Sequence, residues 1–302
     1  MCYSTFRQFF ELHLETATPN KEVMMKFLLS GASLFPLPYQ EILKIARSAG
    51  FDGVEFFLFG GVFGWTDRKV NDCLARARKL GLIVHFHQAW NMEETTEKSL
   101  VQEAMAQVGL LYNRQYALSE HIPASLQDSN VPIVVYAERY IEAIGQQNLW
   151  LQTISLCREQ NGRKEYRLSF AEFEGMFRQG RITSRIALDN QHILEWKSGK
   201  IGVQHISPTK DALLEELLPL VSLLRNSIAE IHFNDCDPRR GVGARNLFPG
   251  DGVMPLEELA DEVKKSVWGE VVVPEVSTLI MMRDPWRNPL KLRRKMAEIW
   301  GG

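Results

Sequence analysis

The sequence predicts an α/β fold in which eight parallel strands close into a single barrel. Strand-like and helix-like segments alternate along the 302 residues, and this alternation is typical of parallel sheets. Three apolar runs in the second half also end in side chains that bind metals, at residues 185–192, 228–235 and 270–277. Because the C-terminal ends of parallel strands converge on one mouth of a barrel, these runs predict a common site there.

Short apolar runs rich in β-branched and aromatic residues predict the strands. In chain order the predicted strands cover residues 27–34, 52–59, 82–88, 132–138, 148–155, 181–189, 228–235 and 270–277. Segments whose apolar residues recur every three to four positions predict the helices. The predicted helices cover residues 39–50, 67–81, 94–108, 139–146, 211–226, 255–267 and 289–300. The first two end at Gly50 and Gly81, and glycine favours helix C-termini.

Two regions depart from this alternation. Residues 110–130 are polar and irregular, and a loop of this length in a compact domain is either functional or a sign of misassignment. We therefore predict an irregular insertion near the fourth strand. Residues 1–25 precede the first strand and are predicted to be an N-terminal extension without a functional role. Residues 26–302 are predicted to form the barrel domain.

The composition disfavours several classes of protein. The formal net charge is −2, without the basic surplus that is typical of proteins that bind nucleic acids. No segment approaches the ~18 consecutive apolar residues of a membrane span, and no convincing signal peptide is present. The four cysteines are widely spaced, which fits a reduced, cytoplasmic protein better than a disulfide framework. The sequence leaves the formation of a homo-oligomer open.

Asp189 and His192 lie three residues apart, where the sixth predicted strand ends. A carboxylate and an imidazole at this spacing can face one cation, or one can bind a metal while the other binds substrate. Alternatively, Asp189 caps the next helix and His192 lies on the surface. Both interpretations remain open at this point.

His232 and Glu275 lie at the ends of the last two predicted strands. The strand alternation can aim His232 inward, although a lone histidine in a strand is more often a core residue. Glu275 follows an apolar run, and a buried carboxylate needs a cationic partner because leaving it charged and unpaired is costly. A metal ion or a basic side chain would supply that partner. Asp235, three residues after His232, is a candidate for substrate binding.

A loop after the seventh strand contains Arg239, Arg240 and Arg245. Arginines beside a barrel mouth could bind a carboxylate or phosphate on a substrate, and they could equally form a solvated loop.

Earlier strands add further candidates. His85 and His87 share one face of the third strand, with core packing the favoured interpretation for His85. Trp90 follows and could form an apolar wall for a sugar ring. Glu55, in the middle of the second strand, could line the same mouth.

These motifs together resemble those of the xylose isomerase-like TIM barrels, a superfamily of sugar phosphate isomerases, epimerases and endonuclease IV-type enzymes. The similar segments, in chain order, are GFDGVEFF, GLIVHFH, ALDNQH, IHFND, FPGDGVMPLEEL and VVVPEV. The resemblance implies a TIM barrel of this type with its active site at the barrel mouth.

For the epimerase branch, the resemblance implies one metal held by Glu, Asp, His and Glu from the fifth to the eighth strand. Asp189, His232 and Glu275 match the last three positions, whereas Gln152 stands at the first. A glutamine cannot serve as a base, although its carbonyl oxygen could bind a metal more weakly than a carboxylate. This departure decides between an active epimerase and a divergent barrel.

The leading hypothesis is therefore a sugar isomerase or epimerase acting on a small keto-sugar, polyol or sugar acid. The divalent metal would be Mn, Zn, Mg or Co. Glu275 or His87 would move the proton, and His192 with the loop residues Arg239 and Arg245 would orient the substrate.

Two alternatives are a barrel that has lost metal catalysis and binds a ligand or a partner, and a metal-dependent phosphodiesterase of the endonuclease IV type. The second alternative is weakened because Ala244 and Asn246 stand where that type has an Asp-x-His.

Overall fold

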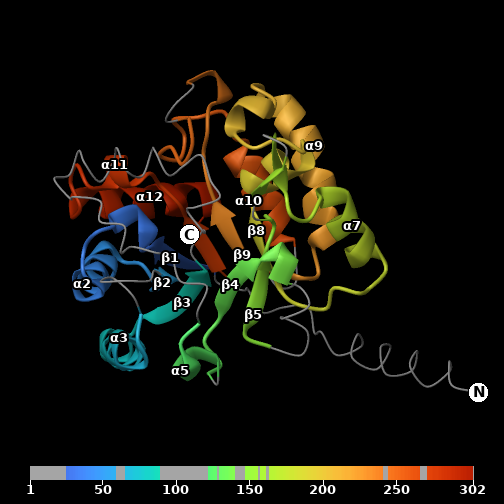
Figure 1. The fold of residues 1–302 in the computed structure, drawn as a ribbon. Helices are drawn as coiled ribbons and strands as arrows, with labels where there is room; N and C mark the ends of the chain where they lie inside the picture. The colour runs from blue at the N-terminus through green and yellow to red at the C-terminus, as the bar shows by residue number, and fades with distance from the viewer. Residues whose placement is uncertain are drawn as a thin grey trace, which may run out of the picture.

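Eight parallel strands close into one barrel in the computed structural model of the chain (Figure 1). The structure describes residues 25–58, 65–88, 122–127, 129–139, 147–155, 157–160, 163–240, 244–265 and 271–301. Each barrel strand is paired with its neighbours in the order β1-β10-β9-β8-β5-β4-β3-β2. The eight-stranded parallel barrel that the sequence predicts is confirmed.

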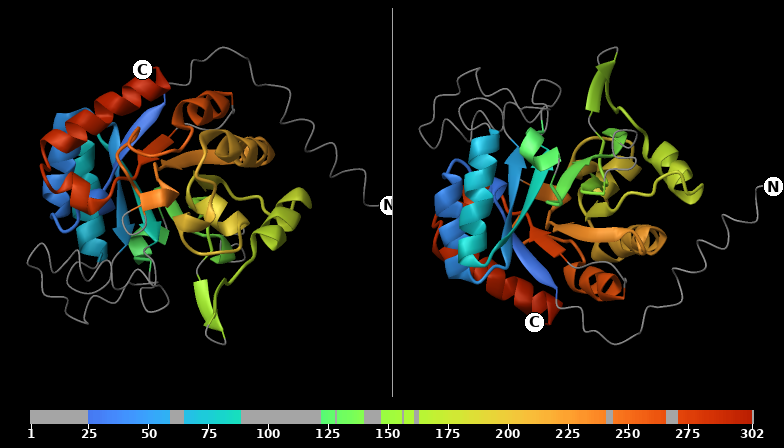
Figure 2. Two further views of the ribbon diagram at one scale, coloured as in Figure 1. Left: turned by 90° about the horizontal axis from the view of Figure 1, so that it is seen from above. Right: turned by 90° about the horizontal axis from the view of Figure 1, so that it is seen from below.

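The barrel strands are short, and helices lie outside them (Figure 2). The strands are β1 (Lys26–Ser30), β2 (Gly53–Leu58), β3 (Ile83–Gln88), β4 (Ile133–Tyr136), β5 (Leu149–Gln152), β8 (Ile186–Asp189), β9 (Ile228–Phe233) and β10 (Val271–Pro274). The helices are α2 (Tyr39–Ala49), α3 (Asp67–Leu80), α5 (Ala124–Gln127), α7 (Phe170–Arg178), α8 (His192–Lys197), α9 (Lys210–Leu224), α10 (Leu256–Lys264), α11 (Thr278–Met281) and α12 (Arg287–Trp300). Short 3₁₀ helices occur at Ala32–Leu34, Ala137–Arg139, Val203–His205 and Pro238–Arg240.

The sequence pattern predicts most elements and misplaces some of their ends. Helices α2 and α3 do end at Gly50 and Gly81, which have φ angles of 80° and 67°. The first strand is shorter than predicted, because the chain turns at Gly31 into a 3₁₀ helix with local backbone hydrogen bonds. The sixth predicted strand begins only at Ile186, since the residues before it connect α7 to the barrel.

A hairpin and a helix between β5 and β8 are missing from the sequence prediction. Strands β6 (Cys157–Gln160) and β7 (Arg163–Tyr166) form an antiparallel hairpin that projects from the barrel (Figure 2). An Asn-Gly pair separates them in the sequence, which is a recognised hairpin signal. Helix α7 begins with a capping box between Ser169 and Glu172, a second signal that was available.

The interior of the barrel changes from apolar to polar along the strands. Near the strand beginnings, Leu28, Val271 and Val273 pack together inside it. Further along, side chains from strands that are not neighbours meet across the interior, as in the contacts of Glu55 on β2 and His232 on β9. The apolar faces on the outside of the strands pack against the helices in the main core. The polar residues therefore gather near the C-terminal ends of the strands.

Several predicted features lie outside the described residues. They are the N-terminal extension apart from Met25, the helix at 94–108, Trp90, and most of the irregular segment and of the helix at 139–146. None of the helices in the described part of the chain has the length and apolar character that crossing a bilayer requires.

Candidate functional site

Four side chains lie together at the C-terminal end of the barrel, and we call them the mouth cluster: Gln152, Asp189, His232 and Glu275. Gln152 and Asp189 end β5 and β8, His232 is the penultimate residue of β9, and Glu275 directly follows β10. The Nδ1 atom of His232 lies 3.2 Å from Gln152 Nε2, 3.8 Å from Asp189 Oδ2 and 3.6 Å from Glu275 Oε1. The structure thus brings together all four predicted ligands.

Asp189 is held by one of its two carboxylate oxygens. Its Oδ1 accepts hydrogen bonds from the backbone N–H groups of Gln191 (3.1 Å) and His192 (2.8 Å) and from the side-chain amide of Asn234 (3.2 Å). Its Oδ2 points into the cluster, where Gln152 Nε2 donates to it at 3.1 Å. Asp189 therefore binds the start of the next helix and also faces the cluster, so the two interpretations left open by the sequence are compatible for this residue.

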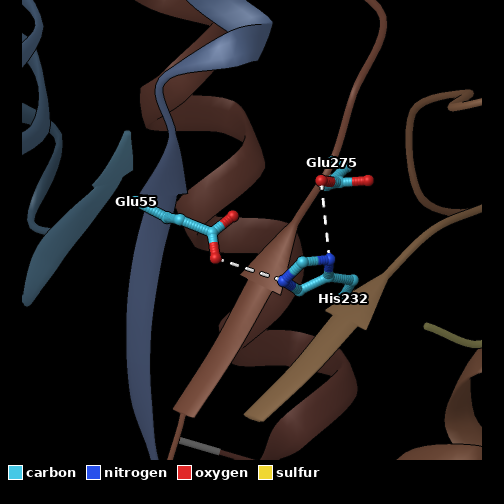
Figure 3. A group of neighbouring side chains, drawn as sticks. All are labelled: Glu55, His232 and Glu275. Carbon is cyan, nitrogen blue, oxygen red and sulfur yellow. Dashed lines mark hydrogen bonds and ion pairs between the residues drawn. The ribbon is translucent and has the colours of Figure 1, made fainter. Parts of the chain in front are cut away.

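His232 presents its two ring nitrogens to different partners. Its Nε2–H donates to Glu230 Oε1 at 3.0 Å and to Glu55 Oε2 at 3.2 Å, on the side away from Glu275 (Figure 3). Burial alone lowers the pKa of His232, but the charges of Glu55 and Glu275 outweigh it and raise the pKa well above the ordinary value. Without a metal, the imidazolium supplies the positive charge that the surrounding carboxylates need.

Behind His232, a second histidine continues the chain of contacts. His85 Nδ1–H donates to Glu230 Oε2 at 2.5 Å, across the barrel from β3 to β9. Sequence reasoning missed Glu230, although it shares a strand face with His232 two residues later. The sequence favoured core packing for His85, and the residue is 5% exposed.

The mouth cluster fits a divalent cation on the Nδ1 side of His232. Two ligands that each lie about 2.1 Å from one ion, at 90–109° to each other, are about 3.0–3.4 Å apart. The contacts of His232 Nδ1 with the other three members, and that of Gln152 with Asp189, run from 3.1 to 3.8 Å, close to that range. Gln152 Oε1 is buried without a hydrogen-bond partner, and turning the amide by half a rotation places this oxygen where Nε2 lies.

Glu55 lies on the other side of the His232 ring. The ligand atoms of Glu55, His232 and Glu275 are all within 4.8 Å of one another. However, Glu55 approaches Nε2 whereas Glu275 approaches Nδ1, and one ion can bond to only one of these nitrogens (Figure 3). We therefore assign Glu55 to the support of His232, and its predicted role in substrate binding has no direct geometric basis among the described residues.

Burial raises the pKa of Glu275, and the nearby His232 partly offsets this effect. A raised pKa brings a carboxyl group closer to neutral operating pH, where it can accept and return a proton. The side chain of Glu275 is 10% exposed, against 0% for Asp189 and His232. Glu275 is thus the member of these three that a substrate can reach most readily.

His87 is a neutral side chain in this site. Burial, followed by the charge of His232, lowers its pKa to about 3. Its Nδ1–H donates to the Gln88 carbonyl oxygen at 2.6 Å, and its ring stacks on Phe57 with centroids 4.4 Å apart. The remaining nitrogen, Nε2, is an acceptor in this tautomer. A hydrogen-bonding role suits His87 better than the predicted transfer of a proton.

His192 is buried, which is inconsistent with the surface position considered from the sequence. Its Nε2 lies 4.0 Å from Asp189 Oδ2, and its Nδ1 lies 3.5 Å from Glu195 Oε2. Burial lowers its pKa, but the charges of Asp189 and Glu195 outweigh this and raise it to about 9. His192 is therefore a cation beside the cluster at neutral pH, as a residue that orients a substrate oxygen would be.

The three loop arginines separate in the structure. Arg245 Nη2 donates to Glu195 Oε2 at 2.6 Å, which connects it to His192 and the mouth cluster. Arg239 is largely exposed and pairs with Asp237 at 2.8 Å, and Arg240 pairs with the same carboxylate at 3.3 Å. Of the two arginines predicted to bind substrate, only Arg245 lies next to the site.

Asp235 holds a loop in place. Its carboxylate accepts four backbone hydrogen bonds, of 2.8–3.1 Å, from Cys236, Gly250, Gly252 and Met254. A Cβ atom at Gly252 would lie 2.2 Å from the Asp235 carboxylate, so only glycine fits there. Both carboxylate oxygens are thus engaged by the turn, which gives Asp235 a structural role in place of the predicted substrate contact.

Solved structures share this architecture at low sequence identity. A xylose isomerase domain protein from Alicyclobacillus acidocaldarius is 14% identical, with 92% of this chain and 98% of the other covered and a TM-score of 0.53. A xylose isomerase domain containing protein from Salmonella typhimurium is 11% identical, with 94% and 100% covered and a TM-score of 0.54. A 3-keto-D-glucoside 4-epimerase from E. coli is 15% identical, with 90% and 99% covered and a TM-score of 0.50.

No family model matches the sequence, and no curated protein matches it either. At these identities the structural likeness establishes the fold and leaves the activity to be argued from the site. The xylose isomerase-like TIM-barrel fold implied by the sequence motifs is confirmed.

Proposed function

We propose that this xylose isomerase-like barrel is an enzyme of the sugar isomerase and epimerase type. Its substrate would be a small keto-sugar, polyol or sugar acid, bound at the barrel mouth with a divalent metal such as Mn, Zn, Mg or Co. One observation carries the proposal: His232 Nδ1 lies 3.2–3.8 Å from atoms of Gln152, Asp189 and Glu275, and Gln152 lies 3.1 Å from Asp189. The epimerase from E. coli with the same fold supports the substrate class.

The residues of the mouth cluster divide the chemistry between them. A divalent cation held by Asp189 and His232, with the Gln152 oxygen, would polarise a carbonyl or a pair of hydroxyl groups of the substrate. Glu275 would remove a proton from the hydroxyl-bearing carbon next to that carbonyl and return it to the carbonyl carbon, while the hydroxyl proton passes to the former carbonyl oxygen. His192, as a cation, would donate a hydrogen bond to a substrate oxygen.

One proton-transferring carboxylate suits isomerisation better than epimerisation. Epimerisation removes a proton from one face of a carbon and returns it to the other face, so two groups on opposite sides serve it best. Gln152 stands where the second carboxylate is expected, and an amide cannot accept the proton. Isomerisation between adjacent carbons can keep the proton on one face, and Glu275 alone is sufficient for that step.

Metal analysis and isotope exchange test the proposal. The purified protein is titrated with Mn²⁺ and Zn²⁺ by calorimetry and compared with Asp189→Ala and with Asp211→Ala, an exposed aspartate on α9. We expect binding that Asp189→Ala abolishes and Asp211→Ala preserves. Incubation of the metal-loaded protein with ketoses in D₂O should then give deuterium next to the carbonyl, measured by NMR. No metal binding above background and no effect of Asp189→Ala would count against the proposal.

The second candidate is a barrel that binds a ligand without a metal. Gln152 favours it, because its amide Nε2 already lies at hydrogen-bond distance from Asp189 Oδ2 and His232 Nδ1, the atoms that would hold a metal. If Gln152→Glu binds Mn²⁺ while the native chain does not, this candidate replaces the first. We do not propose a phosphodiesterase, since Ala244 and Asn246 offer no carboxylate or imidazole to further metals.

A further inference from the structure

A cavity of about 500 Å³ lies at the N-terminal end of the barrel, opposite the mouth. The beginnings of β1, β3, β5 and β10 line it, together with α3 and the residue that precedes β8. We call it the floor cavity. Small-molecule sites occupy ~300–1,000 Å³, so this volume is large enough for a ligand bigger than a bare ion.

The charged side chains that line the floor cavity are all cationic among the described residues. Lys26, Arg78 and Arg185 contribute to its wall, and no carboxylate does. The Arg185 guanidinium carbon lies over the Trp150 ring, 5.7 Å from the ring centroid, a position that orients the fork of N–H donors.

A buried imidazole at the inner end of the floor cavity is available to a ligand. His85 lines the cavity, is 5% exposed, and donates from Nδ1 to Glu230. Its other nitrogen, Nε2, has no hydrogen-bond partner in the described part of the chain. The ring also stands edge-on to Trp150, with centroids 5.1 Å apart, which fixes its orientation. His85 Nε2 is not one of the fully buried side-chain atoms that lack a partner, so water or a ligand in the cavity can reach it.

The remaining wall is apolar. Leu82, Val131 and the Trp150 ring supply surface against which a hydrocarbon or aromatic group can pack. A site with arginines at its rim, an imidazole at its inner end and apolar walls recognises an anionic group carried on an apolar body.

We propose that the floor cavity binds a small organic anion, a molecule that carries a phosphate or carboxylate group on an apolar body. Arg78 and Arg185 hold the anionic group, and His85 Nε2 makes a hydrogen bond at the inner end. This site lies at the end of the barrel that is usually concerned with stability. None of its binding groups is a proposed ligand of the metal at the mouth, so either proposal can fail without the other.

Calorimetric titration of the full chain at constant ionic strength tests this proposal. The probes are phenyl phosphate, benzoate, inorganic phosphate and the neutral benzyl alcohol. We expect saturable binding of phenyl phosphate or benzoate, no binding of benzyl alcohol, and weaker binding of inorganic phosphate. The double variant Arg78→Ala/Arg185→Ala should bind the organic anion at least about tenfold more weakly, because charge-assisted hydrogen bonds are lost.

Arg47→Ala is the matched control, because Arg47 is an exposed arginine on α2 that does not line the cavity. It should leave binding unchanged, and Lys26→Ala, a second variant, should weaken binding less than the double variant does. Circular dichroism melting confirms that each variant is folded. Failure of both organic anions to bind overturns the proposal, as does equal binding by the double variant and the native chain. If inorganic phosphate binds as tightly as the organic anions, the apolar body does not contribute to binding, and the proposed class of ligand is wrong.

Discussion

The two ends of the barrel differ in how their charged side chains are supported. At the mouth, Asp189 and His232 are completely buried, and each contacts other members of the mouth cluster within 4 Å. At the floor cavity, Arg78 on α3 and Arg185, which precedes β8, are exposed. Buried charges depend on their partners because unpaired burial is costly, whereas exposed charges are stabilised by water. A substitution should therefore change stability at the mouth and only ligand binding at the floor cavity.

Three side chains connect the two ends. His85 borders the floor cavity and contacts Glu230, and Glu230 in turn contacts His232 in the mouth cluster. A metal-binding histidine usually donates its second N–H group to a carboxylate, which fixes the ring and increases its basicity. Glu230 has this position relative to His232, so the interior of the barrel supports the mouth.

The largest effect is expected from His232→Ala. The change leaves Glu55 and Glu230 buried without their shared cationic partner, and breaking a buried pair in this way costs about 3–5 kcal/mol in the free energy of unfolding. Urea denaturation at neutral pH measures this loss. His205→Ala, at an exposed histidine, is the control and should change stability by less than about 0.5 kcal/mol. A loss below about 1 kcal/mol for His232→Ala would show that these carboxylates do not depend on the imidazole.

The second effect concerns the loop next to the mouth. Asp235→Ala removes the acceptor of four backbone N–H groups, and we expect a loss of about 2–4 kcal/mol, since some of these groups can bind water instead. Asp235→Asn keeps one carbonyl oxygen and should lose about half as much. Thermal and urea unfolding of the two variants measure the difference. Equal losses would mean that the charge of Asp235, and not its geometry, holds the turn.

Glu230→Gln tests the connection between the ends. If Glu230 orients His232 for a metal, removing its charge should lower Mn²⁺ affinity about 10–100-fold. Calorimetric titration measures the affinity, and circular dichroism confirms the fold. Glu298→Gln, an exposed glutamate on α12, is the control and should bind Mn²⁺ as the native chain does. Unchanged affinity in Glu230→Gln would restrict Glu230 to the support of the barrel interior.

The sequence predicts the mouth cluster well because its members follow apolar strands. Each apolar run marks a buried strand, and a polar residue at its end must lie at the barrel mouth, so Asp189, His232 and Glu275 could be found without knowing how the strands pair. Gln152 was found only through the family resemblance, since nothing local distinguishes it from another strand residue.

Contacts across the barrel and within loops could not be predicted in the same way. Glu230 and His85 are 145 residues apart, and their pairing depends on which strands face each other in the closed barrel. The carboxylate of Asp235 accepts hydrogen bonds from a loop up to 19 residues later in the chain. Arg239 donates a hydrogen bond to Asp237. These outcomes depend on loop geometry, for which the sequence has no periodic signal.

The smallest effect on stability is expected at the floor cavity, and two arginines make the comparison direct. Arg245 at the mouth pairs with Glu195, whose side chain is 1% exposed. Arg245→Ala removes one of the two cationic partners of this buried carboxylate and leaves His192, so it should cost about 1–3 kcal/mol. Arg78 is exposed on α3, and Arg78→Ala should change the free energy of unfolding by less than about 0.5 kcal/mol. Urea denaturation of both variants under the same conditions measures the difference. The same change from arginine to alanine is made at both ends. Equal losses in the free energy of unfolding would therefore show that burial does not distinguish the two ends.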